Sequence, residues 1–151
     1  MTRIFFDANV IIAASASNKG EAHVLTRLAD EREDITILTT EYAWDEAERN
    51  LQQQIPDALP KFYDLRSRVG IVAEPSEGLV KHLASYIPRN KRPPNKDLPI
   101  IAGAIFAAAD YLITHDREHF EPLYGEKVYD VEIQRPAAVL ARLQQPARGG
   151  S

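Results

Sequence analysis

The chain has 151 residues, of which 44% are hydrophobic and 26% are charged, and it contains no cysteine. This length suits one domain with one hydrophobic core, and the lack of cysteine excludes disulfides, zinc–thiolate sites and a thiol nucleophile. The formal net charge of −4 excludes a positive field over the whole surface, so binding of nucleic acid would need a local basic patch.

Short β-branched and aromatic runs alternate with longer helical patterns along the chain. Strands are expected at residues 3–6, 35–38, 70–72, 111–114 and 127–129, and helices at 20–32, 40–53, 57–69, 76–86, 97–109 and 136–144. This alternation predicts an α/β fold, a three-layer α/β/α sandwich with a mainly parallel central sheet. Residues 1–145 are expected to form this domain, and residues 146–151 a frayed, disordered tail.

The helix expected at 97–109 is apolar nearly all round, which predicts that it is buried. Asp97 stands at its start as an N-cap, and Pro99 follows in the first turn, where a missing N–H costs little. The carboxylate of Asp97 lies at one edge of the sheet or the other, depending on topology, and sequence spacing alone leaves this open.

Two acidic residues follow expected strands. Asp7 comes directly after Ile4-Phe5-Phe6, and Asp116 follows the strand at 111–114 with only His115 between them. Ligands of open α/β sheets bind beyond the carboxyl ends of the strands, so both carboxylates are candidates for one site. Clustered carboxylates must be protonated or hold a cation, and Mg²⁺ or Mn²⁺ suits oxygen ligands. Such an ion supports hydrolysis of phosphodiesters without a protein nucleophile.

Four segments, in order, resemble the motifs of the PIN-domain ribonuclease family, which includes the VapC-type toxins of toxin–antitoxin systems. The segments are Ile4–Ile12 with its Asp-x-Asn pattern, Thr39–Glu46, Asn95–Ala104 and Ala109–Asp116. Each segment alone is a weak signal. Their common order and their coverage of nearly the whole chain make the resemblance specific.

The resemblance implies which residues form the site. The metal-binding, catalytic acids would be Asp7, Glu46, Asp97 and Asp116, with Asn9 and Thr114 supporting them. It also implies Mg²⁺ or Mn²⁺ as cofactor, RNA as substrate, a cognate antitoxin protein as partner, and a homodimer. Helical geometry places Glu41 and Glu48 on the flank of the same helix about as well as Glu46, so only the motif selects Glu46.

The proline-rich stretch 88–96 supplies a local basic patch. It contains Arg89, Lys91, Arg92 and Lys96, and it ends one position before Asp97. We predict that this loop guides RNA phosphates toward the acids. The alternative is an ordinary solvated loop, because charged runs are common on surfaces.

Other polar residues near Asp116 invite a metal-binding interpretation. His115 and His119 lack the third ligand that is usual in a zinc site, so we interpret them as imidazoles on the surface or behind the metal ligands. Glu118 remains a candidate for an accessory acid near the metal. Trp44, the only tryptophan, falls on the apolar stripe of its helix and is expected in the core.

Two other classes of protein that place an acid after a strand are disfavoured by the residues at particular positions. A phosphatase of the haloacid-dehalogenase type needs a second acid two residues after Asp7, where this chain has Asn9, and a receiver domain needs an acid where the middle strand ends in Thr39 and Thr40. A catalytically inactive PIN-fold interaction module and a standalone RNA-processing nuclease remain alternatives. No apolar run approaches the roughly 20 residues that span a bilayer, and no signal peptide is recognisable, so we expect a cytoplasmic protein.

Overall fold

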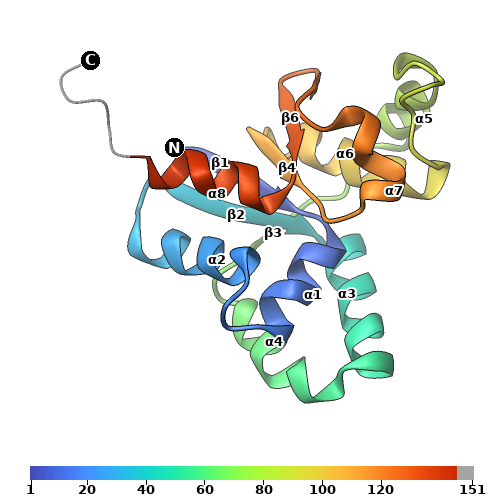
Figure 1. Cartoon of the computed structure of the whole chain (residues 1–151). Helices are drawn as coiled ribbons and strands as arrows, with labels where there is room; N and C mark the ends of the chain where they lie inside the picture. Colours follow the sequence, from blue (N-terminus) through green and yellow to red (C-terminus); the bar gives the residue numbers. More distant parts are fainter. Residues whose placement is uncertain (146–151) are drawn as a thin grey trace.

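The computed structural model describes residues 1–145 and places one six-stranded sheet between two layers of helices (Figure 1). The strands are β1 (Thr2–Phe6), β2 (Ile35–Thr40), β3 (Gly70–Val72), β4 (Tyr111–Ile113), β5 (Lys127–Val128) and β6 (Val131–Gln134). Their order is β3-β2-β1-β4-β6-β5, and every neighbouring pair is parallel except β5 with β6. The predicted α/β fold with a mainly parallel sheet is confirmed. The tail expected at 146–151 lies outside the described residues.

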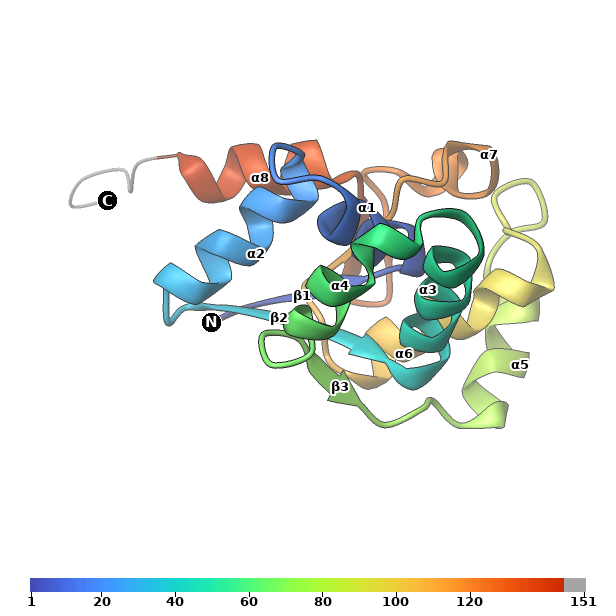
Figure 2. The same cartoon turned by 90° about the horizontal axis from the view of Figure 1, so that it is seen from below.

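Helices cover both faces of the sheet (Figures 1 and 2). On one face α1 (Ala8–Ala16) packs against α2 (Glu21–Glu31), α3 (Glu41–Gln54) and α4 (Leu59–Leu65), while α8 (Pro136–Gln144) packs against α2 and β4. On the other face α5 (Glu77–Tyr86) packs against α6 (Leu98–Phe106), which contacts β2 and β4. The short helix α7 (Arg117–Phe120) follows β4. No helix within residues 1–145 is long and apolar enough to cross a membrane.

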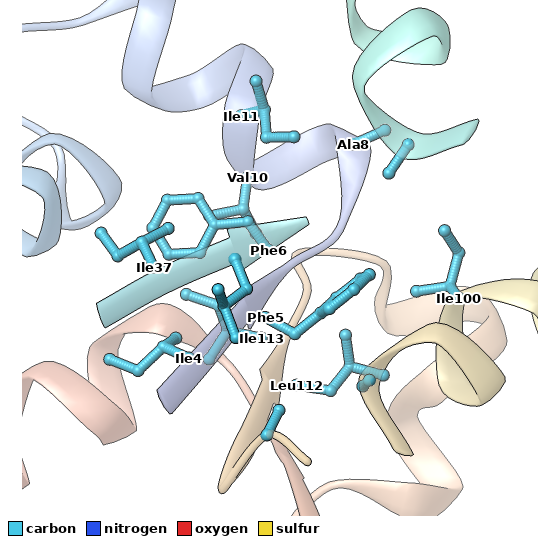
Figure 3. Close-up of a cluster of buried hydrophobic side chains, with 14 of the residues drawn as sticks. Ile4, Phe5, Phe6, Ala8, Val10, Ile11, Ile37, Ile100, Leu112 and Ile113 are labelled. Atoms are coloured by element: carbon cyan, nitrogen blue, oxygen red, sulfur yellow. The ribbon is translucent and has the colours of Figure 1, made fainter. Parts of the chain in front are cut away.

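Strand β1 lies in the middle of the core, and its side chains alternate between the two faces of the sheet. Figure 3 shows Phe5 pointing toward Ile100 of α6, whereas Phe6 points toward Val10 of α1. A Cβ atom at Gly103 of α6 would lie only 3.2 Å from Cζ of Phe5, so the glycine allows α6 to approach the sheet closely. This packing fixes the end of β1, where Asp7 follows.

Three helices or strands were not predicted: α1, β6 and the four-residue helix α7. The run Val10-Ile11-Ile12 is β-branched and favours a strand by propensity, yet it is helical because Asp7 ends β1 and the new helix packs against α2, α3 and α4. The carbonyl of Asp7 accepts hydrogen bonds from the N–H groups of Val10 and Ile11, at 3.0 and 3.2 Å. Strand β6 is only four residues long and follows a tight turn in which Tyr129 has a φ of 54°.

Several predicted boundaries also differ from the observed ones. The helix expected at 57–69 is a 3-10 turn, Pro56–Ala58, followed by α4, and the helix expected at 97–109 is a 3-10 turn, Asn95–Asp97, followed by α6. A third 3-10 turn, Glu121–Leu123, follows α7. Strands β4 and β5 each end one residue earlier than predicted. Element ends are the least determined part of a sequence pattern, because they depend on caps and on tertiary contacts.

Candidate active site

Strand order reverses at β1, because the chain continues to β2 and β3 on one side and reaches β4 on the other. Parallel sheets form a ligand crevice at such a point, beyond the carboxyl ends of the strands. A pocket of about 210 Å³, which we call the acid pocket, lies there. Its polar lining consists of the four predicted acids Asp7, Glu46, Asp97 and Asp116 with Asn9, Asn50, Lys96 and His119.

Asp7 is the most buried of the four acids, with 7% of its surface exposed. Its Oδ1 accepts a hydrogen bond from the N–H of Ala8 at 2.7 Å, and its Oδ2 accepts one from the hydroxyl of Thr114 at 2.8 Å. Burial raises the pKa of Asp7 to about 6, against the opposing effect of these two hydrogen bonds, and the charges of Glu46 and Asp97 add to the rise. The carboxylate is therefore costly to ionise unless a cation is close.

Thr114 connects Asp7 to the rest of the site. Its hydroxyl donates to Asp7 and accepts from Nδ2 of Asn9 and from the N–H of Asp116, each at 3.1 Å. A hydroxyl has one donor and two acceptor positions, so all three are used. Asn9 in turn accepts from the N–H of His115 at 2.9 Å. Asn9 and Thr114 thus link the ends of β1 and β4.

We expect Thr114→Val to loosen the site. Valine keeps the shape of the side chain but leaves three polar partners without their hydrogen bond, at a cost of at least about 1 kcal/mol of unfolding free energy. Loss of the bond to Asp7 is expected to misplace that carboxylate and to weaken binding of Mn²⁺ about tenfold. Chemical denaturation and titration with the metal measure the two effects. Thr114→Ser, which keeps the hydroxyl, is expected to restore most of both; a Ser variant as impaired as the Val variant would contradict this role.

Asp97, Asp116 and His119 form a tighter cluster within the pocket. One potential metal-ligating atom from each residue lies within 4.8 Å of the others. Nδ1 of His119 is 3.0 Å from Oδ2 of Asp97 and 2.9 Å from Oδ2 of Asp116. The other oxygen of Asp116 accepts from the N–H of His119 at 3.0 Å and so caps α7.

Asp97 does not cap its helix as predicted. It occupies the N-cap position of α6, but its side chain makes no capping hydrogen bond and turns toward His119. The topology places the start of α6 at the carboxyl edge of the sheet, which answers the question that spacing left open. The hydroxyl of Tyr42 donates to the carbonyl of Lys96 at 3.2 Å and holds this turn against α3. Asp97 is therefore directed into the pocket.

Two atoms of this cluster are buried without a hydrogen-bond partner among the described residues. They are Oδ2 of Asp97 and Nδ1 of His119, which lie close together but lack hydrogen-bond geometry. Burial raises the pKa of Asp97, opposed by the charge of His119 and reinforced by that of Asp116. Unpaired buried polar atoms beside several carboxylates fit a divalent cation, and the oxygen-rich ligand set suits Mg²⁺ or Mn²⁺.

Of the two interpretations of His119, a surface imidazole or one behind the metal ligands, the structure excludes the first. The side chain of His119 is 23% exposed and contacts two of the acids, so it is more than a surface group. The signal available was its position three residues after Asp116, which brings the two side chains together on a short helix. His115 is exposed and contributes only its backbone N–H to Asn9. Glu118 is exposed and does not line the pocket.

The three glutamates on α3 have different partners. Glu41 forms an ion pair with Arg66 at 3.0 Å, and Glu48 accepts a hydrogen bond from the hydroxyl of Tyr63 at 2.7 Å. Glu46 is exposed and is the glutamate of α3 that lines the acid pocket. Helical geometry alone made these three glutamates equal candidates, and in the structure Glu46 is the one that lines the acid pocket. Trp44 is buried, as predicted, and stacks on Phe62.

In the basic loop, residues 88–96, two of the four cationic side chains are bound to other groups of the protein. Lys91 pairs with Glu126, and Arg92 donates two hydrogen bonds to the carbonyl of Ile87, at 3.1 and 3.0 Å. Arg89 is exposed, and Lys96 lines the acid pocket. Two of the four predicted cations thus remain available to an anionic ligand.

Comparison with protein-family models gives no match, and comparison with curated proteins gives no significant match. Solved structures do match. VapBC2 from Rickettsia felis, solved with a fragment of promoter DNA, has a TM-score of 0.63 and 16% identity over 89% of this chain and 98% of that one. VapBC-1 from nontypeable Haemophilus influenzae has a TM-score of 0.62 and 18% identity over 90% and 99%.

A third match is VapC20 from Mycobacterium tuberculosis, a toxin that cleaves the sarcin–ricin loop. Its TM-score is 0.55, with 14% identity over 76% of this chain and 91% of that one. At these identities the similarity establishes the fold. The chain has the fold of VapC-like PIN domains, as the sequence resemblance predicted.

Proposed function

We propose that the chain is a Mg²⁺- or Mn²⁺-dependent endoribonuclease. One observation carries the proposal: four carboxylates, contributed by the ends of β1 and β4, by α3 and by the start of α6, line a single pocket at the switch point of a PIN-like sheet. Such a cluster repels itself unless a cation is bound. The chain offers no cysteine, and the described lining of the pocket contains no serine or threonine, so the proposal assigns the nucleophile to a water activated by the metal.

In this proposal each residue has a defined task. Asp97 and Asp116 hold the ion with Asp7 and Glu46, and the bonds from Thr114 and Ala8 keep Asp7 in place. Each carboxylate oxygen has two acceptor positions, so Asp7 can still ligate a cation. Nδ1 of His119 lies 3.0 and 2.9 Å from Oδ2 of Asp97 and of Asp116 and would complete this group of candidate ligands. Bound Mg²⁺ or Mn²⁺ supplies a Lewis acid that activates water and neutralises charge on the phosphate.

The basic loop serves substrate binding in this proposal. Lys96 lines the acid pocket and is proposed to contact a phosphate next to the cleaved bond, and the exposed Arg89 adds a second cation of the same loop. Lys91 and Arg92 contribute their charge at longer range, since they are held by Glu126 and Ile87.

Direct cleavage assays test the proposed activity. The purified chain is incubated with a pool of single-stranded transcripts in Mg²⁺, in Mn²⁺ and in EDTA, and the RNA ends are sequenced. We expect cleavage with either metal and none with EDTA. Intact RNA in every metal would favour the inactive interaction module, and cleavage that persists in EDTA would reject the metal-dependent mechanism.

We further propose that the nuclease is the toxin of a toxin–antitoxin pair, on the basis of its fold similarity to VapBC proteins. Expression of the chain alone is expected to stop growth, and coexpression with the protein encoded beside it is expected to restore growth. Unimpaired growth on expression of an active nuclease would instead favour a standalone RNA-processing enzyme.

A homodimer is also proposed. Several large apolar or aromatic side chains are exposed in the monomer, including Tyr86, Phe106 and Tyr129 at 49%, 55% and 43%. Exposed apolar groups of this size favour self-association when they gather on one face. Light scattering is expected to give about twice the 16.9 kDa monomer mass at micromolar concentration. A mass that stays at the monomer value would contradict the dimer.

A further inference from the structure

A second pocket lies beside the acids at the same edge of the sheet. It measures about 400 Å³, and we call it the arginine pocket. Its lining residues are Arg117, Glu121, Tyr124, Gly125, Gln134 and Arg135. Arg117 directly follows Asp116, and Gln134 ends β6, the strand that pairs with β4. The N–H of Thr114 donates to the carbonyl of Gln134 at 3.1 Å. This bond connects a residue that holds Asp7 of the acid pocket to a residue that lines the arginine pocket.

Tyr124 stands between the acids and the arginines. Its hydroxyl donates to the carbonyl of Thr114 at 3.2 Å, and the guanidinium of Arg135 lies 6.0 Å from the centre of its ring. Burial raises the pKa of Tyr124, and the negative charge of Asp116 adds to this rise while Arg135 opposes it. Because the hydroxyl of Thr114 also hydrogen-bonds to Asp7 and to the N–H of Asp116, Tyr124 connects the arginine pocket directly to the acid pocket.

The two arginines are available to a ligand. Within residues 1–145 the ion pair of Arg117 is with Glu121, at 4.0 Å between side chains that are 73% and 66% exposed. An exposed pair at this distance contributes little and is easily exchanged for another anion. Arg135 is exposed, and its side chain makes no hydrogen bond or ion pair in the same range, in contrast to Lys91 and Arg92 of the basic loop.

We propose that the arginine pocket binds a backbone phosphate of the single-stranded RNA whose cleavage is proposed above, and the inference rests on that function. An RNA strand that enters an acidic pocket is repelled by the carboxylates and by the net charge of −4 on the chain. Cationic contacts must therefore lie next to the acids. Guanidinium groups bind phosphate oxygens in a bidentate manner, and two of them converge on this pocket. The position fixes one direction in which the RNA leaves the acid pocket.

Binding measurements without metal separate this inference from catalysis. A labelled single-stranded oligoribonucleotide is titrated with protein in EDTA at several salt concentrations, and fluorescence anisotropy gives Kd. For the double variant Arg117→Ala with Arg135→Ala we expect about tenfold weaker binding and a slope of log Kd against log salt that is smaller by about 0.7, the contribution of the one phosphate that both arginines are proposed to hold on a single strand. Replacement of both arginines by lysine is expected to restore most of the slope.

A matched control removes two positive charges outside both pockets. Arg27 on α2 and Lys81 on α5 are exposed and line neither pocket, so Arg27→Ala with Lys81→Ala is expected to keep the wild-type slope. Thermal melting checks that every variant is folded.

Three outcomes would overturn the inference. One is a salt slope of the pocket variant equal to that of the control while the wild type binds and cleaves RNA; the proposed nuclease then stands. Another is an unchanged slope combined with lost capture of the coexpressed neighbouring protein, which would assign the pocket to an acidic segment of a protein partner. Failure of the wild type both to bind and to cleave RNA would reject the nuclease and the phosphate site together.

Discussion

Replacing Asp116 by asparagine is expected to reduce RNA cleavage at least about 10²-fold while the fold is retained, because in the proposed nuclease this carboxylate would help to hold the metal that activates water. Asparagine still offers an oxygen to the N–H of His119, the contact through which Asp116 caps α7. Initial rates at a Mg²⁺ concentration that just saturates the wild type measure the loss, and circular dichroism measures the fold.

The matched control is Glu31→Gln, which also neutralises an acid but lies exposed at the end of α2, outside the acid pocket. Its cleavage rate is expected to equal that of the wild type. A tenfold excess of Mg²⁺ is expected to recover part of the Asp116→Asn activity, since the remaining acids still bind the ion, though more weakly. Unchanged cleavage by Asp116→Asn would remove this residue from the site.

The sequence predicts the acids at the strand ends because two local signals coincide there. A short apolar run predicts a buried strand, and the carboxylate after it must lie at the end of that strand. This reasoning holds for Asp7 and Asp116, whose strands β1 and β4 are neighbours in the sheet. The direction of Asp97 could not be predicted, because it depends on which edge of the sheet α6 starts from, and that edge is set by the crossover from β3 through α5.

Other features required contacts between distant parts of the chain. Glu46 differs from Glu41 and Glu48 only because residues of α4 and its C-cap engage the other two. The arginine pocket joins Arg117 to Arg135 through the pairing of β4 with β6, a strand too short to be recognised from its pattern. Helix α1 was missed because its β-branched run Val10-Ile11-Ile12 favours a strand by propensity and shows little helical periodicity.

Asp7→Asn is expected to change how stability depends on pH in the metal-free protein. The pKa of Asp7 rises from 3.8 to about 6 on folding, mainly through burial, so the folded state binds the proton more tightly than the unfolded state. The resulting stabilisation is present below pH 3.8 and is lost as the pH rises through about 6. This shift corresponds to roughly 3 kcal/mol at about 1.36 kcal/mol per pKa unit.

Urea denaturation in EDTA between pH 4 and pH 7.5 measures this effect. The wild type is expected to lose unfolding free energy over this range relative to Asp7→Asn, whose amide does not titrate. Comparing the two proteins cancels the contribution of groups such as Asp34, whose pKa is lowered by its hydrogen bond to Arg32 and which acts in the opposite direction at lower pH.

Added Mg²⁺ should reverse the loss. A cation beside Asp7 favours its ionised form, so Mg²⁺ is expected to stabilise the wild type at pH 7.5 in proportion to the logarithm of its concentration and to stabilise Asp7→Asn much less. Cleavage by Asp7→Asn should fall together with this response, because the same carboxylate that destabilises the metal-free protein binds the ion. Parallel pH curves for the two proteins, or equal stabilisation of both by Mg²⁺, would show that Asp7 is a structural residue outside the metal site.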